Sequence, residues 1–491
     1  MASQQPRSLS PLRDVERGQH SDTDSSSARE VDEEKHSVED APPSPSDDSD
    51  IDGARDDPAQ LSQQQTKEDR LDGNGSVLSR VASRVLTRPS TKSSWNPGPP
   101  PDGGLQAWLA VASTHIVVMN TWGVVNSFGL FQTYYTDALH RPPSDVSWIG
   151  SLQIFLLFFV GALTGRLTDA GYFRHVFAIG IVFQIVGIFT ASVATQYWQV
   201  VLAQGICMGL GNGKKRSLAI GMAACGSATG GLVFPSMVRQ LAPVQGFPAA
   251  MRAIGYVQIA TFVVAIAGLK QRIPPRRSGP WVEWRAFREG EYTLYAMGSF
   301  SFFLGLYFAF YYIASFSRDI IGMSYTDSLN LLLVMNGAGV SGRLIPNHIA
   351  DRAGTINVFI PTAGIAGVCV LCWMAVKDTA GLYVWAVFYG MAAGGIQSLF
   401  PAGLSGLTTD LRKAGVRMGM VFTIVSFATL AGPPIAGAII TASGGKYYGA
   451  QAFAGATLML GMVLMVAARW VKVKRILREE NKTGFGWHVK V

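Results

Sequence analysis

Twelve runs of mostly apolar residues, each about as long as a bilayer is thick, constrain this chain more than any other feature. A helix needs about 20 such residues to cross the hydrocarbon core of a membrane. The runs occupy residues 107–131, 147–167, 175–195, 198–213, 218–238, 251–270, 293–315, 328–349, 356–376, 381–404, 417–441 and 447–470. They predict an all-α membrane protein with twelve transmembrane helices, and they exclude a single soluble enzyme domain.

A polar and basic stretch after the sixth run divides the body into two halves of six helices. We therefore expect an N-terminal tail (1–100), a first half (101–270), a cytoplasmic linker (271–292), a second half (293–470) and a C-terminal tail (471–491).

Charge separates the N-terminal tail from the body. Residues 1–72 contain 19 Asp and Glu against eight Lys and Arg, a net charge of −11, whereas residues 73–491 carry +19. The first 100 residues are rich in Ser, Asp, Glu, Gln and Pro without apolar periodicity, which is typical of a disordered segment. The overall charge of +8 averages an acidic tail and a basic membrane body, so it does not indicate nucleic-acid binding.

Lys and Arg are also unequally divided between the two sides of the predicted bundle. If the tail is cytosolic, the inside connections carry fifteen of them and the outside connections carry six. Because positive residues are retained on the cytosolic side, both termini are predicted to be cytoplasmic. We expect a monomer in the plasma membrane, with the vacuolar membrane as the alternative.

Two short motifs occur at matching places in both halves. GlyArgLeuThrAspAlaGlyTyrPheArg (165–174) and HisIleAlaAspArgAlaGly (348–354) each place an acid and a glycine in a tight turn. ArgSerLeuAlaIleGlyMet (216–222) and ValArgMetGlyMet (416–420) each precede a helix of small residues, which permit close helix approach in lipid. Two matching halves are typical of a transporter with a central cavity.

Other segments resemble a known family. ProAspGlyGlyLeuGlnAlaTrp (101–108) and LysLysArgSerLeuAlaIleGlyMetAlaAlaCysGly (214–226) resemble signature motifs of the monocarboxylate-transporter-like branch of the major facilitator superfamily. ThrTrpGlyValValAsnSerPheGlyLeuPheGlnThrTyrTyr (121–135) and SerTrpIleGlySerLeuGln (147–153) resemble its fungal members. The resemblance covers residues 101–470. It implies the major facilitator fold and rocker-switch transport of a small organic solute, often an organic acid, frequently coupled to protons.

The chain departs from this family at two functional positions. Asn126 stands where the animal carriers place a lysine that helps to relay the proton. Arg343 matches their substrate arginine, but Gly339 replaces the acid one helical turn before it. The resemblance therefore implies anion binding by this chain and leaves the coupling ion open.

The spacing of the fourth span departs as well. Gly394 lies 26 residues before Met420 in the second half, whereas Gly209 lies only 13 residues before Met222 in the first. By this comparison about a dozen residues are missing at Gly213–Lys214, which leaves a shortened fourth helix of about 16 residues where about 20 are needed. We hypothesise a misassigned splice junction or a degenerate gene.

Sequencing the transcript across Gly213 tests this hypothesis. If a splice junction is misassigned, the transcript will encode about a dozen further residues at this point. These would complete a span of about 20 residues. An uninterrupted read that matches the chain would remove the splice explanation.

Polar side chains inside the runs are the candidate substrate ligands. Arg343 is the strongest, because a charge at such depth costs about 2.5–3.5 kcal/mol on insertion scales, and a guanidinium can hold a carboxylate through two hydrogen bonds. The alternative is an arginine that extends to the inner surface. Four polar residues within the runs contact either the substrate or neighbouring helices: Asn126, Gln153, Asn336 and Gln397. Three aromatic residues form either a wall of the site or ordinary packing: Tyr307, Tyr311 and Phe400.

Further residues are candidates for coupling and gating. His115 is the candidate proton carrier, since histidine exchanges a proton near neutral pH, and a helix contact is its alternative role. Asp169 with Arg166, and Asp351 with Arg352, are predicted gate residues that pair and separate as the halves rock. Capping of the turns is the structural alternative.

Taken together, the sequence favours a secondary active transporter that exports an organic acid or secondary metabolite. The alternatives are an uptake carrier for a nutrient, monocarboxylate or vitamin, and a ligand sensor without transport. The glycine-rich run CysMetGlyLeuGlyAsnGly (207–213) lacks a preceding strand and a GlyLysSer/Thr ending, and the sequence has no HExxH or GxSxG site, so an enzyme is not expected. The four cysteines lie in apolar runs, and neither a metal nor a cofactor is expected.

Overall fold

The computed structural model describes residues 104–211, 220–269, 282–408, 413–479 and 491. Every described residue belongs to one compact unit, Trp95–Val491. The predicted N-terminal tail and the junction at Gly213–Lys214 therefore lie outside the described residues, as do residues 271–281 of the predicted linker.

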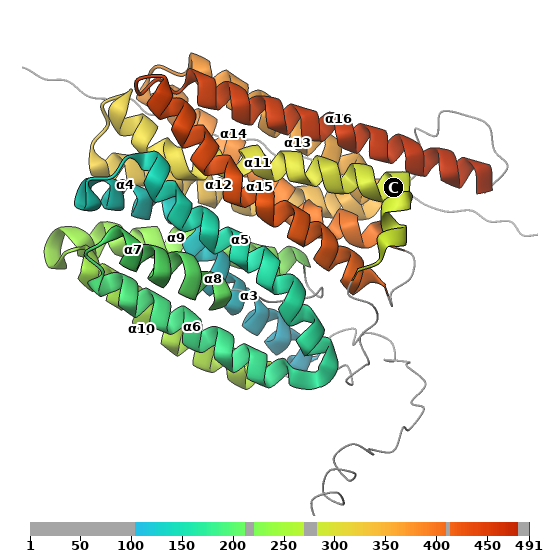
Figure 1. Ribbon diagram of the computed structural model, residues 1–491, viewed down its shortest axis with the longest axis horizontal. Coiled ribbons are helices and arrows are strands. Elements are labelled where there is room, and N and C mark those ends of the chain that lie inside the picture. The colour runs from blue at the N-terminus through green and yellow to red at the C-terminus, as the bar shows by residue number, and fades with distance from the viewer. Residues whose placement is uncertain (1–103, 212–219, 270–281, 409–412, 480–490) are drawn as a thin grey trace, which may run out of the picture. The chain divides into compact units, whose positions relative to one another are not determined.

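Helices make up the described body, and they form two bundles that lie against each other (Figure 1). The first bundle, blue to green in the figure, contains α3 (Leu105–Asn126), α4 (Phe128–Leu139), α5 (Pro143–Leu167), η1 (Thr168–Tyr172), α6 (Phe173–Val193), α7 (Tyr197–Val200), η2 (Val201–Met208), α8 (Gly209–Gly211), α9 (Ile220–Gln245) and α10 (Phe247–Gly268). The second, yellow to red, contains η3 (Trp284–Arg288), α11 (Gly290–Asp319), α12 (Tyr325–Ala353), α13 (Thr355–Cys372), η4 (Trp373–Ala375), α14 (Thr379–Gly406), α15 (Ala414–Ala442) and α16 (Tyr448–Glu479).

The described helices follow the predicted runs in order, with different bounds. Among the described residues, nine helices are long and apolar enough to cross a membrane. α9, α12 and the segment α7–α8 are outside that set, so the count of twelve crossings stays a prediction. The first predicted span is divided at Ser127 into α3 and α4, and α16 continues to Glu479, beyond the predicted boundary at 470.

The two bundles repeat the same internal arrangement. In the first bundle the turn between α5 and α6 depends on Gly171 at φ 98°, and in the second the turn between α12 and α13 depends on Gly354 at φ 95°. Glycine tolerates this left-handed backbone because it has no Cβ. In the first bundle α9 packs on α3 and α10 packs on α6, while in the second α15 packs on α11 and α16 packs on α13. The acid–glycine turns predicted from the sequence are thus equivalent elements of two similar bundles.

We call the end where α10 finishes at Gly268 and α11 begins at Gly290 the linker end, and the opposite end the far end. At the far end the two bundles are joined by polar contacts. Arg318 on α11 forms an ion pair of 3.2 Å with Asp137 on α4, and the Tyr312 hydroxyl donates to the carbonyl of Pro143 at 3.4 Å. These contacts connect α11 to both α4 and α5.

Glycine determines how closely α12 and α14 approach. A Cβ added at Gly342 of α12 would lie 1.9 Å from the carbonyl oxygen of Met391 on α14, and one at Gly390 would lie 2.2 Å from that of Met335. Because neither glycine has a side chain, the two helices pack backbone to backbone. Small residues produce such close approach in lipid, where the hydrophobic effect does not drive helices together.

Substituting Gly342 by valine should therefore destabilise the second bundle by about 2 kcal/mol or more, as overpacking does in a tightly packed interior. The measurement is the temperature at which the detergent-solubilised protein loses its monodisperse profile. Gly161 on α5 is the matched control, because a Cβ there meets nothing within 4 Å. Equal transition temperatures for the Gly342→Val and Gly161→Val variants would contradict the packing described here.

Candidate functional site

Arg343 lies on α12, closer to the linker end of that helix than to the far end, and is 1% exposed. Its Nη1 donates to the carbonyl oxygen of Gly339 at 2.9 Å, and its Nη2 donates to Oε1 of Gln397 on α14 at 2.7 Å. Both acceptors are neutral. Among the described residues no carboxylate pairs with this guanidinium, whose electrostatic neighbours are Cys225 and Tyr307.

The glycine at 339 fits the guanidinium and explains one departure from the resembled family. A Cβ at Gly339 would lie 2.7 Å from Nη1 of Arg343, and a Cβ at Gly394 of α14 would lie 3.1 Å from the same atom. An acidic side chain at 339 would have to displace the arginine from its present position. The main-chain carbonyl of Gly339 therefore stands as acceptor where the carriers place a carboxylate.

Several polar side-chain atoms of the described residues are buried without a hydrogen-bond partner. Burying such atoms is costly unless they are satisfied, so clusters of them in a native protein call for an explanation by ligand or water. Among the residues predicted to bind substrate, the unpaired atoms are Arg343 Nε, Gln397 Nε2, both side-chain polar atoms of Asn126 and of Gln153, Asn336 Oδ1, and the hydroxyls of Tyr307 and Tyr311.

Aromatic rings from both bundles meet where α5, α11, α14 and α15 pack together. Phe303 on α11 lies 4.9 Å from Phe400 on α14 and 5.7 Å from Phe158 on α5, measured between ring centroids. Phe422 on α15 contacts both Phe158 and Phe400 at 5.3 Å. Tyr307, one turn from Phe303, is fully buried and its hydroxyl lacks a partner. We call Phe158, Phe303, Phe400 and Phe422 the aromatic junction.

Sequence reasoning selected Phe400 but missed the other three members of this junction. Each is an ordinary apolar residue of its own span, and only the packing of α5, α11, α14 and α15 brings them together. No pattern along the sequence could have identified the group.

The predicted polar ligands are only partly brought together. Asn336 lies two turns before Arg343 on α12, and its amide donates to the carbonyl of Asn126 in the first bundle at 3.5 Å. Tyr311 is buried and its ring lies 4.6 Å from that of Phe128. These contacts place Asn126, Asn336 and Tyr311 at the boundary between the bundles, on the far-end side of Arg343.

Two other candidates lie apart from this group. Gln153 packs against the fourth span: a Cβ added at Gly209 would lie 3.2 Å from the Cα atom of Gln153. His115 is half-buried on α3, about three helical turns from Asn126, and its carbonyl oxygen packs against Gly226. The structure joins neither residue to Arg343 and Gln397, so a role in substrate contact or proton transfer stays a prediction.

The predicted gate residues occupy the turns at the linker end. Arg166 lies in the last turn of α5, and Asp351 and Arg352 lie in the last turn of α12, where both are exposed. The side chain of Asp169 lies outside the part of the chain that the structure describes. Gating by these residues therefore stays a prediction.

A cluster of charges that the sequence did not reveal also lies at the linker end. Arg417 in the first turn of α15 donates from Nε to Glu283 at 3.1 Å and from Nη1 to Glu289 at 2.7 Å. Lys413 contacts Glu283 at 3.0 Å, and the Tyr292 hydroxyl donates to the Arg417 carbonyl at 2.8 Å. We call Glu283, Glu289, Lys413 and Arg417 the linker cluster. Its two cations and two anions balance, and it fixes the end of the linker to α15.

Glu283 makes this attachment sensitive to pH. Burial raises the pKa of its carboxyl, but hydrogen bonds from Arg417 and Lys413 outweigh burial, and the pKa falls below the ordinary glutamate value. A carboxylate with a lowered folded pKa contributes its full stability above its unfolded pKa and loses it as the pH falls through the folded value.

We therefore expect the linker to stay attached at neutral pH and to detach only as the pH falls below the ordinary glutamate pKa of about 4.3. A spin label on Trp284→Cys, in a background without other cysteines, should gain mobility in that range. In the Glu283→Gln variant this pH step should disappear. A step of unchanged size in that variant would assign the transition to another group.

Comparison with known proteins identifies similar membrane transporters. A family model described as Major Facilitator Superfamily matches residues 111–408. An MFS-type transporter of Gibberella zeae is 54% identical over 393 residues, covering 77% of this chain and 89% of the relative. The aspyridones efflux protein apdF of Emericella nidulans is 33% identical over 391 residues, covering 76% of this chain and 80% of the relative.

A solved structure has a similar fold. The human organic anion transporter MFSD10 (TETRAN) superposes with a TM-score of 0.55 and 13% sequence identity, covering 74% of this chain and all of that chain. At this identity the likeness concerns the fold alone.

Proposed function

The chain belongs to the Major Facilitator Superfamily, and on that premise we propose that it exports a small organic anion by alternating access. It is a multi-pass membrane protein and a transporter, as expected from the sequence, and its family and relatives are transporters, not enzymes. The monocarboxylate-transporter-like branch, the target membrane and the coupling ion stay predictions.

The observation that carries this proposal is the buried charge of Arg343. A buried cation is tolerated when it is paired and hydrogen-bonded, and leaving one uncompensated is strongly destabilising. Within the part of the chain that the structure describes, the guanidinium has two acceptors, both neutral, and its Nε has none. An anionic substrate would supply the missing counter-charge, and a planar carboxylate would match the donor geometry of the guanidinium.

Gln397 completes the proposed site. Its Oε1 accepts from Arg343 while its Nε2 has no partner, so the side chain can yield its place to a carboxylate and then donate to it. The direction of transport is proposed from the relatives. One relative is named as an efflux protein for aspyridones, and export of an acidic organic metabolite is the function that fits this site.

Replacing Arg343 by lysine should reduce transport about tenfold or more with normal surface expression, because lysine keeps the charge but loses the two-pronged geometry. The measurement is a metabolite comparison of cells and medium between a deletion strain carrying the wild type and one carrying Arg343→Lys. An acid retained inside the variant cells identifies both the solute and the direction. Arg478→Lys, at an exposed position near the end of α16, is the matched control.

Gln397→Glu provides a second test at the same site. The new carboxylate would take the place of Oε1, 2.7 Å from Nη2 of Arg343, and act as a built-in counter-ion. We expect the apparent affinity for the exported anion to fall about tenfold, since the substrate must then displace a charge. Transport kinetics equal to wild type in both variants would overturn the assignment of Arg343 as the anion-binding group.

A further inference from the structure

α16 is longer than a membrane requires. It runs over Tyr448–Glu479, 32 residues and about 48 Å of helix, whereas the hydrocarbon core of a bilayer is about 30 Å thick. A Cβ added at Gly290, the first residue of α11, would lie 3.3 Å from the side chain of Val471. The residues after Val471 therefore continue past the start of α11, and Figure 1 shows them as the red end of α16. We call residues 471–479 the α16 extension.

Exposed aromatic residues mark where α16 enters and leaves the apolar part of the bilayer. Tyr448 is 57% exposed and Trp470 is 54% exposed. They lie 22 residues apart, which corresponds to about 33 Å of helix. Tyrosine and tryptophan are enriched at both membrane–water interfaces. The large exposed side chains between them are apolar, and we call Leu460, Val463 and Val466 the apolar stripe. The α16 extension therefore starts at the membrane surface.

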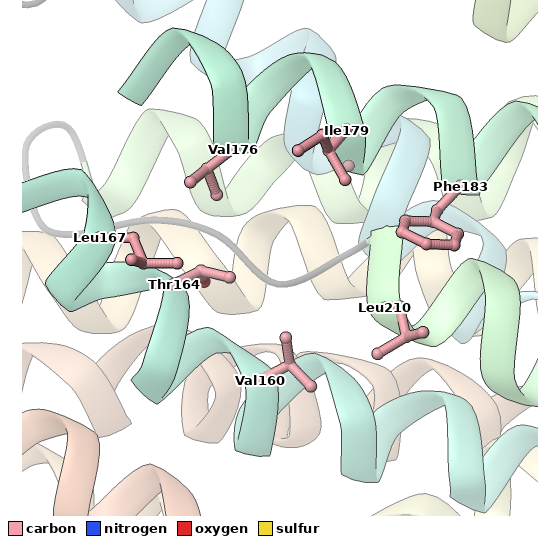
Figure 2. Close-up of a pocket in the computed structure, with 8 residues that line it drawn as sticks. Val160, Thr164, Leu167, Val176, Ile179, Phe183 and Leu210 are labelled. Carbon is pink, nitrogen blue, oxygen red and sulfur yellow. The ribbon is translucent and has the colours of Figure 1, made fainter. Parts of the chain in front are cut away.

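The first bundle is also apolar on its outside at the linker end. Figure 2 shows Leu167, the last residue of α5, and Ile179 on α6 among other apolar side chains, and both are exposed. The helices that carry them are apolar enough to cross a membrane. The α16 extension differs from these surfaces, because it carries four Lys or Arg and one Glu.

Two cations of the α16 extension are used within the protein. Lys472 donates to the carbonyl oxygen of Gly406, the last residue of α14, at 3.0 Å. A cation is favourable at this end of a helix because the carbonyl groups there carry partial negative charge. Arg475 forms ion pairs with Glu291 in the first turn of α11 and, at 3.5 Å, with Glu479. These contacts hold the extension against α14 and α11.

The outer face of the extension presents a tryptophan and a lysine together. Trp470, Lys474 and Arg478 follow one another at intervals of four residues, so they line one face of the helix, and all three are exposed. Nζ of Lys474 lies 3.6 Å from the centroid of the Trp470 ring, a cation–π contact that holds the ammonium beside the indole. Over the described residues of the extension the ion pairs are those of Arg475, so the charge of Lys474 is not neutralised by them.

Depth separates Lys474 from Arg478. Along the helix axis Lys474 lies about 6 Å beyond Trp470, and Arg478 lies about 12 Å beyond it. The headgroup layer adds about 5–7 Å to each side of the hydrocarbon core. Lys474 is therefore level with the lipid phosphates, whereas Arg478 lies in the water beyond them.

We propose that Trp470 and Lys474 bind the headgroup phosphate of an anionic phospholipid in the leaflet nearest the linker end. The ammonium and the indole N–H donate to the phosphate oxygens, and the acyl chains lie along the apolar stripe. If the linker end is cytosolic, as the sequence predicts, the site belongs to the leaflet with the negative surface potential. The proposal is independent of the transported solute, since it concerns the outer surface of one helix.

The test measures lipid binding to the purified full-length protein by native mass spectrometry, with phosphatidylserine and phosphatidylcholine as probes. The wild type should hold its first phosphatidylserine about fivefold more tightly than its first phosphatidylcholine, which is the contribution of one cation at an anionic surface. Lys474→Gln should remove this preference, and Lys474→Glu should reverse it. Arg478→Gln is the matched control, because it removes a cation from the same helix face at the wrong depth, and it should keep the preference.

Three results would overturn the proposal. The first is an equal loss of preference in Lys474→Gln and Arg478→Gln, which would show an effect of overall charge. The second is displacement of bound phosphatidylserine by millimolar glycerol 3-phosphate, which has no acyl chain and would show a site for soluble anions. The third is loss of the preference when a protease site inserted after Glu479 is cut to remove residues 480–491, since the phosphate would then be held by those residues.

Discussion

A buried positive charge that no carboxylate of the described residues pairs with is the constraint around which the second bundle is arranged. Arg343 can remain between α12 and α14 because Gly339 and Gly394 have no side chains at the positions that its guanidinium approaches. The same absence of side chains lets the two helices pack through their backbones. The same glycines therefore permit both the close packing of α12 and α14 and the burial of the guanidinium. A bound anion would stabilise the buried charge further by replacing a neutral acceptor with a charged one.

Arg417 shows the opposite way to bury an arginine in the same protein. Its guanidinium contacts two glutamates, and its ring neighbour Tyr292 lies 5.5 Å below the charge. Because its charge is balanced by glutamates, Arg417 stabilises the fold. Arg343 has no such counter-charge among the described residues and keeps a donor without an acceptor. The difference between the two sites is the number of carboxylates, and it separates a group that holds the fold together from one suited to binding a ligand.

The spans could be predicted from the sequence, whereas the contacts between them could not. Apolar runs of bilayer length predict helices well, because a membrane leaves the backbone few alternatives, and a charged residue within such a run is conspicuous. The partner of that charge is less accessible: Gln397 is 54 residues away from Arg343, and their contact depends on how α12 packs on α14. The charge balance around Arg417 likewise arises from tertiary contacts that leave no periodic pattern.

The linker cluster has a consequence for how the two bundles communicate. α15 carries Arg417 at one end and packs along α5 of the first bundle over much of its length, with Phe427 lying 5.3 Å from Phe155. The polar connection between the halves is thus attached to the helix that forms their boundary. A change of charge among residues 283–289 would therefore act directly on a helix that both bundles share as a packing surface.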